Sequence, residues 1–348
     1  MSNIPTTLQK KTDAKYDILK FVLSLFILAI HAKVYPTVLF PWLRVAVPLF
    51  FMISSYFLFS KLHATPSGEH GGILKKFVIR NVQLYACWFV ILLPITLYVR
   101  KNAYFGGSVW DGIVAFIKTV LFSSTFVASW FISASVFGVL IIYGLCKLLR
   151  KNWLVLPVAL FAFVIVTITS SYSPAFADTV LSAAVIGYLK IFGSLIYSFP
   201  AALLWVLVGK LFAEHKIKIP VIWLVVGIIL SGVALYFEWR FVVALDQSYT
   251  NDSYFMLAPL CFFLFAAIQR MKPLEWRPSL YLRRLSTVIY VLHGSLVIVV
   301  NKVLSVLLHI NLPLLSYVVT LIGCVGVYAL IEFLIAKCRH NKLFKMLY

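Results

Sequence analysis

Residues 18–36, with the sequence ILKFVLSLFILAIHAKVYP, form the first of the long apolar stretches that decide the fold. Their length matches the ~20 residues that a helix needs to cross a hydrocarbon core of roughly 30 Å. Lysines precede the stretch as in a signal peptide, but it continues through His31 and Tyr35 without a clear small-x-small cleavage site. We therefore interpret it as a retained first membrane helix.

Nine further stretches of this kind follow, at residues 42–61, 81–99, 130–149, 153–172, 194–213, 220–237, 253–270, 285–303 and 313–336. Backbone amides find no water inside a bilayer, so each stretch is expected to be helical. The predicted fold is all-α: a polytopic transmembrane bundle of about ten spans. One domain is predicted over residues 18–336, between cytoplasmic tails at 1–17 and 337–348. The weaker amphipathic segment Val109–Phe122 is expected to lie along the interface or to re-enter.

Composition excludes a soluble protein. Hydrophobic residues make up 62% of the 348 residues, charged residues only 12%, and the mean hydropathy is +0.98. The net charge of +20 could suggest a nucleic-acid partner, but the basic residues lie between the apolar stretches. That placement is typical of membrane topology and of attraction to anionic lipids, so we predict lipid contact and no nucleic-acid binding.

The distribution of basic residues predicts the orientation. Of the 31 Lys and Arg residues, 23 fall on the side of the N terminus when alternate segments are counted, and the other 8 fall on the opposite side. Short cytoplasmic loops carry such an excess of Lys and Arg. Both termini are therefore predicted to be cytoplasmic.

The cysteines do not form a metal-binding pattern. They are scattered, odd in number and without a CxxC pair, at Cys87, Cys146, Cys261, Cys324 and Cys338. We expect them to be small apolar packing residues and predict no metal site.

Ionisable residues inside a membrane span are costly, so they provide the candidates for function. His31 lies in the outer part of the first span, eleven residues after Lys20. The two are roughly 16 Å apart along a helix axis, and eleven residues is close to three turns, so both point to one side. One helix thus presents a cation near the cytoplasmic edge and an imidazole deeper in the membrane.

Three further motifs follow along the chain. Arg44 precedes the sequence VPLFFMISSYF at 47–57, the pair Trp130–Phe131 opens the fourth span, and STVIYVLH occupies 286–293. Together with Lys20-x10-His31, these pieces resemble the acyltransferase-3 family of membrane acyltransferases over nearly the whole chain. The chain is also similar to the enterobacterial common antigen O-acetylase type and to the membrane half of vancomycin-resistance serine racemases.

Three positions depart from the family pattern. Lys20 stands where the family has Arg, which keeps the charge but loses the planar guanidinium. The family's Arg-x-x-Arg motif is replaced by Lys75-Lys76 followed by Arg80, and Ser55 stands where a Gly is usual.

The resemblance implies an enzyme that transfers an acyl group in a bacterial plasma membrane. It implies acetyl-CoA or another short acyl-CoA as co-substrate on the cytoplasmic side, with no permanently bound cofactor. The acceptor it implies is a hydroxyl of a glycan or lipid-linked sugar. The resemblance also implies that His31 is essential, and imidazole can either remove a proton from the hydroxyl or carry the acyl group. Arg44 can stabilise an oxyanion.

The phosphates of CoA suit basic residues of the cytoplasmic side, which are Lys20, Lys75, Lys76, Arg80, Arg283 and Arg284. Further cavity candidates are His293, Asp252, Ser253 and Trp130. Glu332 is the one carboxylate placed within a predicted span, either paired with a buried cation or close to the cytoplasmic edge.

Plainer explanations exist for the same residues. His31 also fits a helix-end histidine at the lipid interface, and Arg44 fits a side chain that reaches the external head groups. The positive-inside bias alone accounts for the cytoplasmic cations. Asp252 and Ser253 fit a helix cap, and Trp130 fits an interfacial aromatic belt. His293 either lines a cavity or bonds a neighbouring helix.

Two rival functions stay open at this point. A permease for a small polar molecule such as serine also uses intramembrane ionisable residues, although the sequence lacks paired Gly-interrupted helices typical of inverted repeats. The other rival is a catalytically inactive membrane scaffold.

Overall fold

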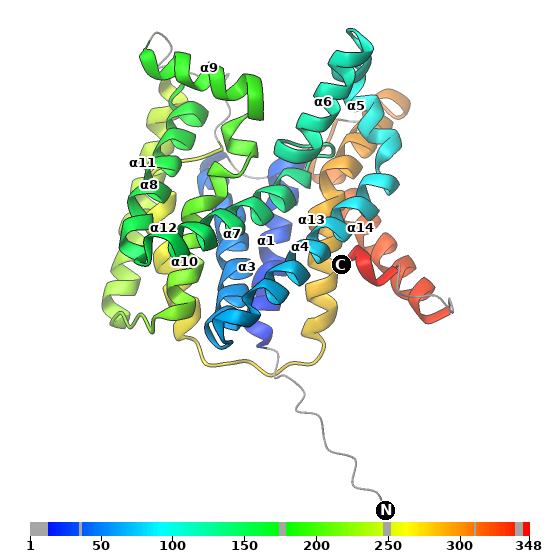
Figure 1. Cartoon of the computed structure of the whole chain (residues 1–348). Helices are drawn as coiled ribbons and strands as arrows, with labels where there is room; N and C mark the ends of the chain where they lie inside the picture. Colours follow the sequence, from blue (N-terminus) through cyan, green and yellow to red (C-terminus); the bar gives the residue numbers. More distant parts are fainter. Residues whose placement is uncertain (1–12, 35–36, 174–178, 246–251, 310, 338–343) are drawn as a thin grey trace, which may run out of the picture.

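The structure is a computed structural model that describes residues 13–34, 37–173, 179–245, 252–309, 311–337 and 344–348. Its elements are helices throughout these ranges, so the predicted all-α class is confirmed (Figure 1). In chain order the α-helices are α1 (Ala14–Ala32), α2 (Phe40–Leu43), α3 (Ala46–His63), α4 (His70–Ile91), α5 (Leu93–Phe105), α6 (Val109–Phe122), α7 (Ser129–Leu149), α8 (Asn152–Ser171), α9 (Val180–Phe192), α10 (Pro200–Glu214), α11 (Val221–Leu245), α12 (Leu257–Arg270), α13 (Ser279–Lys302) and α14 (Pro313–Lys337).

Within the described residues, six helical segments are long and apolar enough to cross a membrane. They are Phe40–His63, Ser129–Leu149, Asn152–Ser171, Val221–Leu245, Ser279–Val306 and Pro313–Lys337. A seventh is added if the bent pair α4–α5 counts as one span. A multi-pass membrane protein is therefore supported, whereas the predicted count of ten spans is not confirmed.

The remaining three predicted spans correspond to α1, α10 and α12. Charged residues at Lys15, Asp17 and Lys20 occupy the first two turns of α1. The helices α10 and α12 have 15 and 14 residues, about 22 Å and 21 Å of helix, which is less than the hydrocarbon thickness. The sequence windows at 194–213 and 253–270 include residues before these helices, and α10 begins only at Pro200, a residue suited to a first helical turn.

The predicted span at 81–99 is broken in the structure. The helices α4 and α5 meet at Leu92 with an angle of 83° between them. Pro94, at the start of α5, has no N–H to donate to the carbonyl of Val90, so a continuous helix cannot be maintained there. The amphipathic segment Val109–Phe122 forms α6 with a capping box at Ser108, and α9 is a helix that the hydropathy pattern did not predict.

The centre of the bundle is made by two closely packed helix pairs, α3 with α10 and α1 with α13. Much of α3 and α13 is buried, whereas α11 and α14 expose most of their apolar side chains and are peripheral. Gly209 of α10 lies against Ser55 of α3, and a Cβ at position 209 would overlap the Ser55 hydroxyl. The serine that departs from the family pattern is therefore accommodated by a glycine opposite it.

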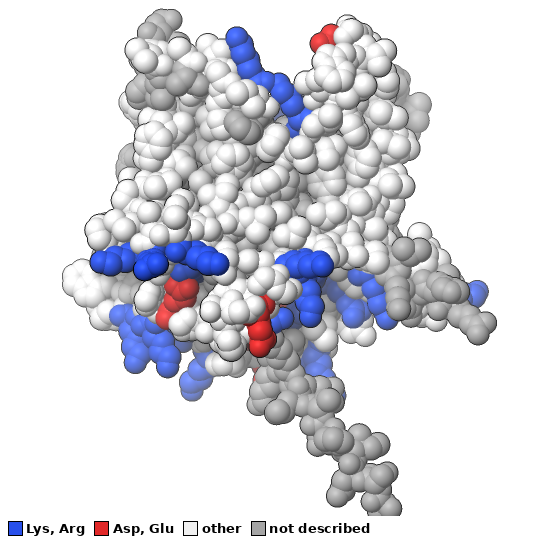
Figure 2. All heavy atoms as spheres, in the orientation of Figure 1, with Lys and Arg blue, Asp and Glu red and all other residues white. Residues whose placement is uncertain are grey.

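Basic residues gather at one end of the bundle, which we call the basic end (Figure 2). It holds the start of α1, the loop 64–69 and the loop 271–278. The backbone N–H of Ala14 donates to Leu274 O at 2.8 Å, and Lys15 Nζ donates to Met271 O at 2.9 Å, so the first and last of these segments are in contact. That the basic end is cytoplasmic stays a prediction from charge. Residues 1–12 and 338–343 of the predicted tails lie outside the described residues.

At the opposite end, two parts of the molecule project on either side of a notch. One part carries α9 and the other carries the hairpin of α5 and α6 (Figure 1). The space-filling view shows the surface hollowed between them (Figure 2).

Candidate functional site

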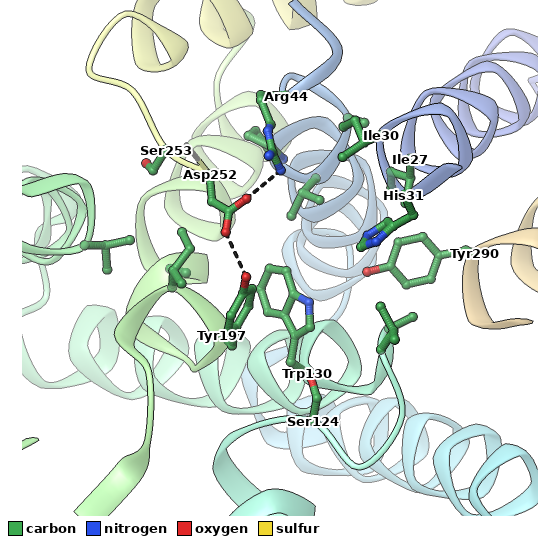
Figure 3. A pocket seen from close by; sticks show the side chains of 18 of the residues that line it. Ile27, Ile30, His31, Arg44, Ser124, Trp130, Tyr197, Asp252, Ser253 and Tyr290 are labelled. Atoms are coloured by element: carbon green, nitrogen blue, oxygen red, sulfur yellow. Dashed lines mark hydrogen bonds and ion pairs between the residues drawn. The ribbon is translucent and has the colours of Figure 1, made fainter. Parts of the chain in front are cut away.

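A cavity of about 270 Å³ lies within the half of the bundle that faces this notch. The predicted residues His31, Arg44, Trp130, Asp252 and His293 all line it. Figure 3 labels the first four of them. His31 comes from α1, Trp130 from α7 and His293 from α13. Arg44 lies in the turn before α3, and Asp252 lies in the segment before α12. The fold thus brings together residues from most of the chain.

One wall of the cavity is a hydrogen-bonded chain of three side chains. Arg44 Nη1 lies 2.7 Å from Asp252 Oδ1, and the Tyr197 hydroxyl donates to Asp252 Oδ2 at 2.8 Å. The ring of Trp130 packs edge-on against Tyr197 with centroids 5.7 Å apart. Both oxygens of Asp252 are thus occupied, and its main contact is an ion pair with Arg44, where the sequence alone also allowed a helix cap.

The opposite wall carries a pair of histidines. His31 is exposed to the cavity, and its ring centroid lies 4.8 Å from that of buried His293. His293 Nδ1 donates to the carbonyl oxygens of Tyr290 at 2.6 Å and of Ile289 at 3.1 Å. In a neutral ring this leaves Nε2 as an acceptor, and Nε2 is buried with no hydrogen-bond partner among the described residues. Figure 3 shows His31 and Tyr290 side by side, across the cavity from Arg44 and Asp252.

A second polar group lies near the basic end. Lys20 of α1 is within electrostatic range of Arg80 on α4 and Arg283 on α13, and we call these three residues the cation cluster. Asp17 accepts hydrogen bonds from Arg283 Nε at 2.7 Å and Nη2 at 3.1 Å, and from the Ser279 hydroxyl at 2.8 Å. This carboxylate fixes Arg283 and leaves Lys20 and Arg80 with excess positive charge.

The helices α1 and α13 connect the two groups. Both begin at the basic end, and they run side by side: Lys20 is near Arg283, and His31 contacts His293 eleven residues further along α1 and ten further along α13. The predicted placement of Lys20 and His31 on one side of a helix agrees with this arrangement. Ser24 lies between them on the same face and is fully buried.

The other predicted residues are bonded to protein groups or exposed away from the cavity interior. Ser253 lines the cavity, but its hydroxyl is bonded to that of Thr167 at 2.9 Å. Lys75 and Lys76 are exposed on α4. Arg284 Nη1 pairs with Glu332 at 3.1 Å, which resolves the role of that carboxylate in favour of an ion pair between α13 and α14.

Sequence reasoning missed five polar residues of the cavity wall: Arg100, Ser123, Ser124, Tyr197 and Tyr290. Tyr197 and Ser124 precede helices in short connecting segments, where no periodic pattern indicates which way a side chain points. Arg100 was counted only as one of the external basic residues. The described residues hold no group of three or more His, Cys, Asp and Glu side chains arranged to bind a metal ion.

The fold and this site define a multi-pass helical membrane protein with a histidine and an arginine in an internal cavity. The sequence model of the acyltransferase-3 family, described as an acyltransferase domain, matches residues 13–332. The chain belongs to this family.

Comparison with curated proteins finds two relatives from Enterococcus faecalis, each named amino-acid racemase. One is 22% identical over 299 residues, which cover 80% of this chain and 39% of the relative. The other is 29% identical over 153 residues, which cover 40% of this chain and 20% of the relative. The chain thus spans about two fifths of the length of the first relative. No solved structure matches the chain.

Proposed function

We propose that this protein is a membrane O-acyltransferase of a bacterial plasma membrane. It moves an acetyl or other short acyl group from cytoplasmic acyl-CoA to a hydroxyl of an extracytoplasmic glycan or glycolipid. The observation that carries the proposal is the parallel pair α1–α13, which has the cation cluster at one end and the two histidines at the other. Such a pair links a phosphate-binding group to an imidazole in a separate, oppositely placed cavity.

The cavity residues supply the chemistry that the reaction needs. In the direct route, His31 takes the proton of the acceptor hydroxyl while the oxygen of that hydroxyl forms a bond to the thioester carbonyl carbon. The carbon–sulfur bond then breaks, and the imidazolium returns the proton to the CoA thiolate. In the two-step route, a ring nitrogen of His31 attacks the thioester carbonyl carbon, and the carbon–sulfur bond breaks to release the CoA thiolate. The acceptor hydroxyl then attacks the acyl group on His31, the nitrogen–carbon bond breaks to restore the imidazole, and the hydroxyl proton passes to the thiolate. In both routes Arg44 stabilises the oxyanion that forms at the carbonyl oxygen.

On the donor side, Lys20 is expected to bind the phosphates of CoA. We predict that Lys20→Gln raises the KM for acetyl-CoA about tenfold and changes kcat little, since a charge-assisted bond to phosphate is worth about 1.5–3 kcal/mol. Lys20→Arg, which restores the residue of the family pattern, should retain or lower the KM. Steady-state kinetics on the purified protein measures both.

The matched control for Lys20 is Lys147→Gln, because Lys147 is an exposed cation of the last turn of α7. Its KM should equal that of the wild type. A Lys20→Gln variant with an unchanged KM would remove Lys20 from the donor site.

Sealed vesicles test the proposed reaction itself. Protein is reconstituted so that the basic end faces the lumen, labelled acetyl-CoA is enclosed, and crude cell-envelope glycan is supplied outside. Label should appear on the external glycan in proportion to the protein present. Label that stays inside as acetyl-CoA or free acetate would refute the proposal.

A second candidate is supported by one feature of the cavity. The ion pair Arg44–Asp252 presents a cation and an anion 2.7 Å apart, a complement to the carboxylate and ammonium groups of an amino acid. The relatives named amino-acid racemase give this candidate a chemical context. Uptake of labelled serine into the same vesicles without acetyl-CoA, and without any transfer of label, would favour the permease over the enzyme.

A further inference from the structure

The cavity carries more positive than negative charge. Among the described residues that line it, Arg44 and Arg100 are cationic and Asp252 is the one carboxylate. Arg44 and Tyr197 already occupy the two oxygens of Asp252. Arg100 is therefore left as a cation that the cavity itself does not neutralise.

Arg100 is held in place by a hydrogen bond to a backbone carbonyl group. Its Nη2 donates to the carbonyl oxygen of Ser124 at 2.9 Å. The segment that contains Ser124 is itself anchored, because Thr125 N donates to the Ser129 hydroxyl at 2.9 Å and the Tyr85 hydroxyl bonds Thr125 Oγ1 at 2.8 Å. A fixed segment thus presents a half-buried guanidinium, with donors left over, to the cavity.

Three other arginines of the bundle are paired with carboxylates. Arg44, Arg283 and Arg284 each contact a carboxylate, at 2.7 Å, 2.7 Å and 3.1 Å. Within the described part of the chain, Arg100 has no such contact. A planar guanidinium is suited to bidentate binding of phosphate or carboxylate, so a free one in a cavity wall has the chemistry of an anion site.

The position of Arg100 strengthens this assignment. It lies in the half of the bundle away from the basic end, on the side that the charge bias of membrane proteins leaves poor in Lys and Arg. Nearby, Lys118 of α6 donates to the carbonyl oxygen of Lys190 on α9, which places another cation between the two parts that border the notch. Cations at the entrance and in the wall of one cavity attract an anionic ligand toward it.

We propose that the acceptor of this enzyme is anionic and that Arg100 is the residue that binds its oxyanion. The acceptor class is a polyol or sugar that carries a phosphate or carboxylate near the hydroxyl to be acylated. Arg100 then sets specificity, whereas His31 performs the transfer. Acylation of that hydroxyl rests on the proposed function, whereas binding of the anion by Arg100 does not.

Equilibrium binding to the purified protein tests the proposal without an acyl donor. The probes are glycerol 3-phosphate, glycerate and glycerol, which share a small polyol skeleton and differ in their charged group. The proteins are the wild type, Arg100→Gln, Arg100→Lys and the control Arg240→Gln, an exposed arginine of α11. Gln at 100 keeps a donor for the Ser124 carbonyl, and Lys at 100 keeps the charge if the Gln variant fails to fold.

We expect the affinity for at least one charged probe to fall tenfold or more in Arg100→Gln, and to fall less in Arg100→Lys. Arg240→Gln should bind as the wild type does, and glycerol should bind most weakly to every protein. The charged probe that shows the loss identifies phosphate or carboxylate as the recognised group. Equal affinity of the wild type and Arg100→Gln for both charged probes would overturn the proposal, as would wild-type binding of glycerol as tight as that of the charged probes.

The result is separable from the proposed reaction. His31→Ala should retain binding of the charged probe, because binding of an anion by Arg100 needs neither a base nor an acyl donor. If Arg100-dependent binding is found but no acyl transfer occurs in vesicles, the enzyme proposal fails and the anion site stands.

Discussion

Replacement of His31 by alanine is expected to reduce acyl transfer by about 10²–10⁴-fold, the usual contribution of a general base. The side chain is exposed to the cavity and is the imidazole best placed to reach an acceptor, because the ring of His293 is buried behind it. The variant should insert and fold, since removal of a cavity-facing side chain leaves the core packing unchanged. Transfer of label from acetyl-CoA measures the effect.

The matched control for His31 is His215→Ala, because His215 is exposed at the end of α10. It should retain the wild-type rate. Turnover at the wild-type rate in His31→Ala would defeat the assignment of His31. Acid quenching during turnover separates the two chemical routes, because only the two-step route leaves an acyl group covalently bound at position 31.

Arg44→Ala should lower the transfer rate by about 10²–10³-fold, the usual effect of losing one oxyanion donor. Arg44 lies within electrostatic range of the His31 ring and is anchored by Asp252, so its guanidinium has a fixed direction in the cavity. Arg44→Lys should recover part of the rate, because it keeps the charge but not the planar fork. Single-turnover rates measure the loss in the chemical step.

A second explanation of such a loss is that Asp252 becomes an unpaired carboxylate. The double variant Arg44→Ala/Asp252→Ala separates the two causes. If Arg44 acts on the reacting oxygen, the double variant stays as slow as Arg44→Ala. If the unpaired carboxylate is the cause, the rate recovers, and Arg44 is then only a partner of Asp252.

Much of the fold could be predicted from the sequence. Long apolar stretches, such as those at 130–149 and 313–336, appear as α7 and α14 within a residue or two of their predicted bounds. Hydropathy predicts such helices well because every backbone amide in a bilayer needs an internal partner. The same pattern could not reveal the break at Leu92, since the residues on both sides of Pro94 are equally apolar.

The number of spans was harder to predict. Hydropathy does not distinguish a helix buried among other helices from one that faces lipid, because both are apolar. The helix α10 illustrates this: it is largely buried and has only 15 residues. The sequence around it reads as a full span only because the preceding segment, which contains Tyr197, is apolar too.

The residues of the site were likewise only partly predictable from the sequence. The register Lys20-x10-His31 and the family motifs indicated His31, Arg44 and His293, which line one cavity, and the roles given to them stay predictions. Helical spacing made the side to which His31 points predictable. Tyr197 lies in a short connecting segment, and Arg100 lies on α5 beyond the break at Leu92, so local spacing in the sequence did not indicate that either lines the cavity. The ion pair of Arg44 with Asp252 joins residues more than 200 positions apart and becomes visible only in three dimensions.

The central claim is that His31 faces a cavity entered from the end opposite the cation cluster. Sided labelling of His31→Cys, with the five native cysteines replaced by serine or alanine, tests it most directly. In sealed vesicles of known orientation, a membrane-impermeant maleimide should modify position 31 when added to the side away from the basic end, and not from the other side. Modification from the basic end alone would contradict the account.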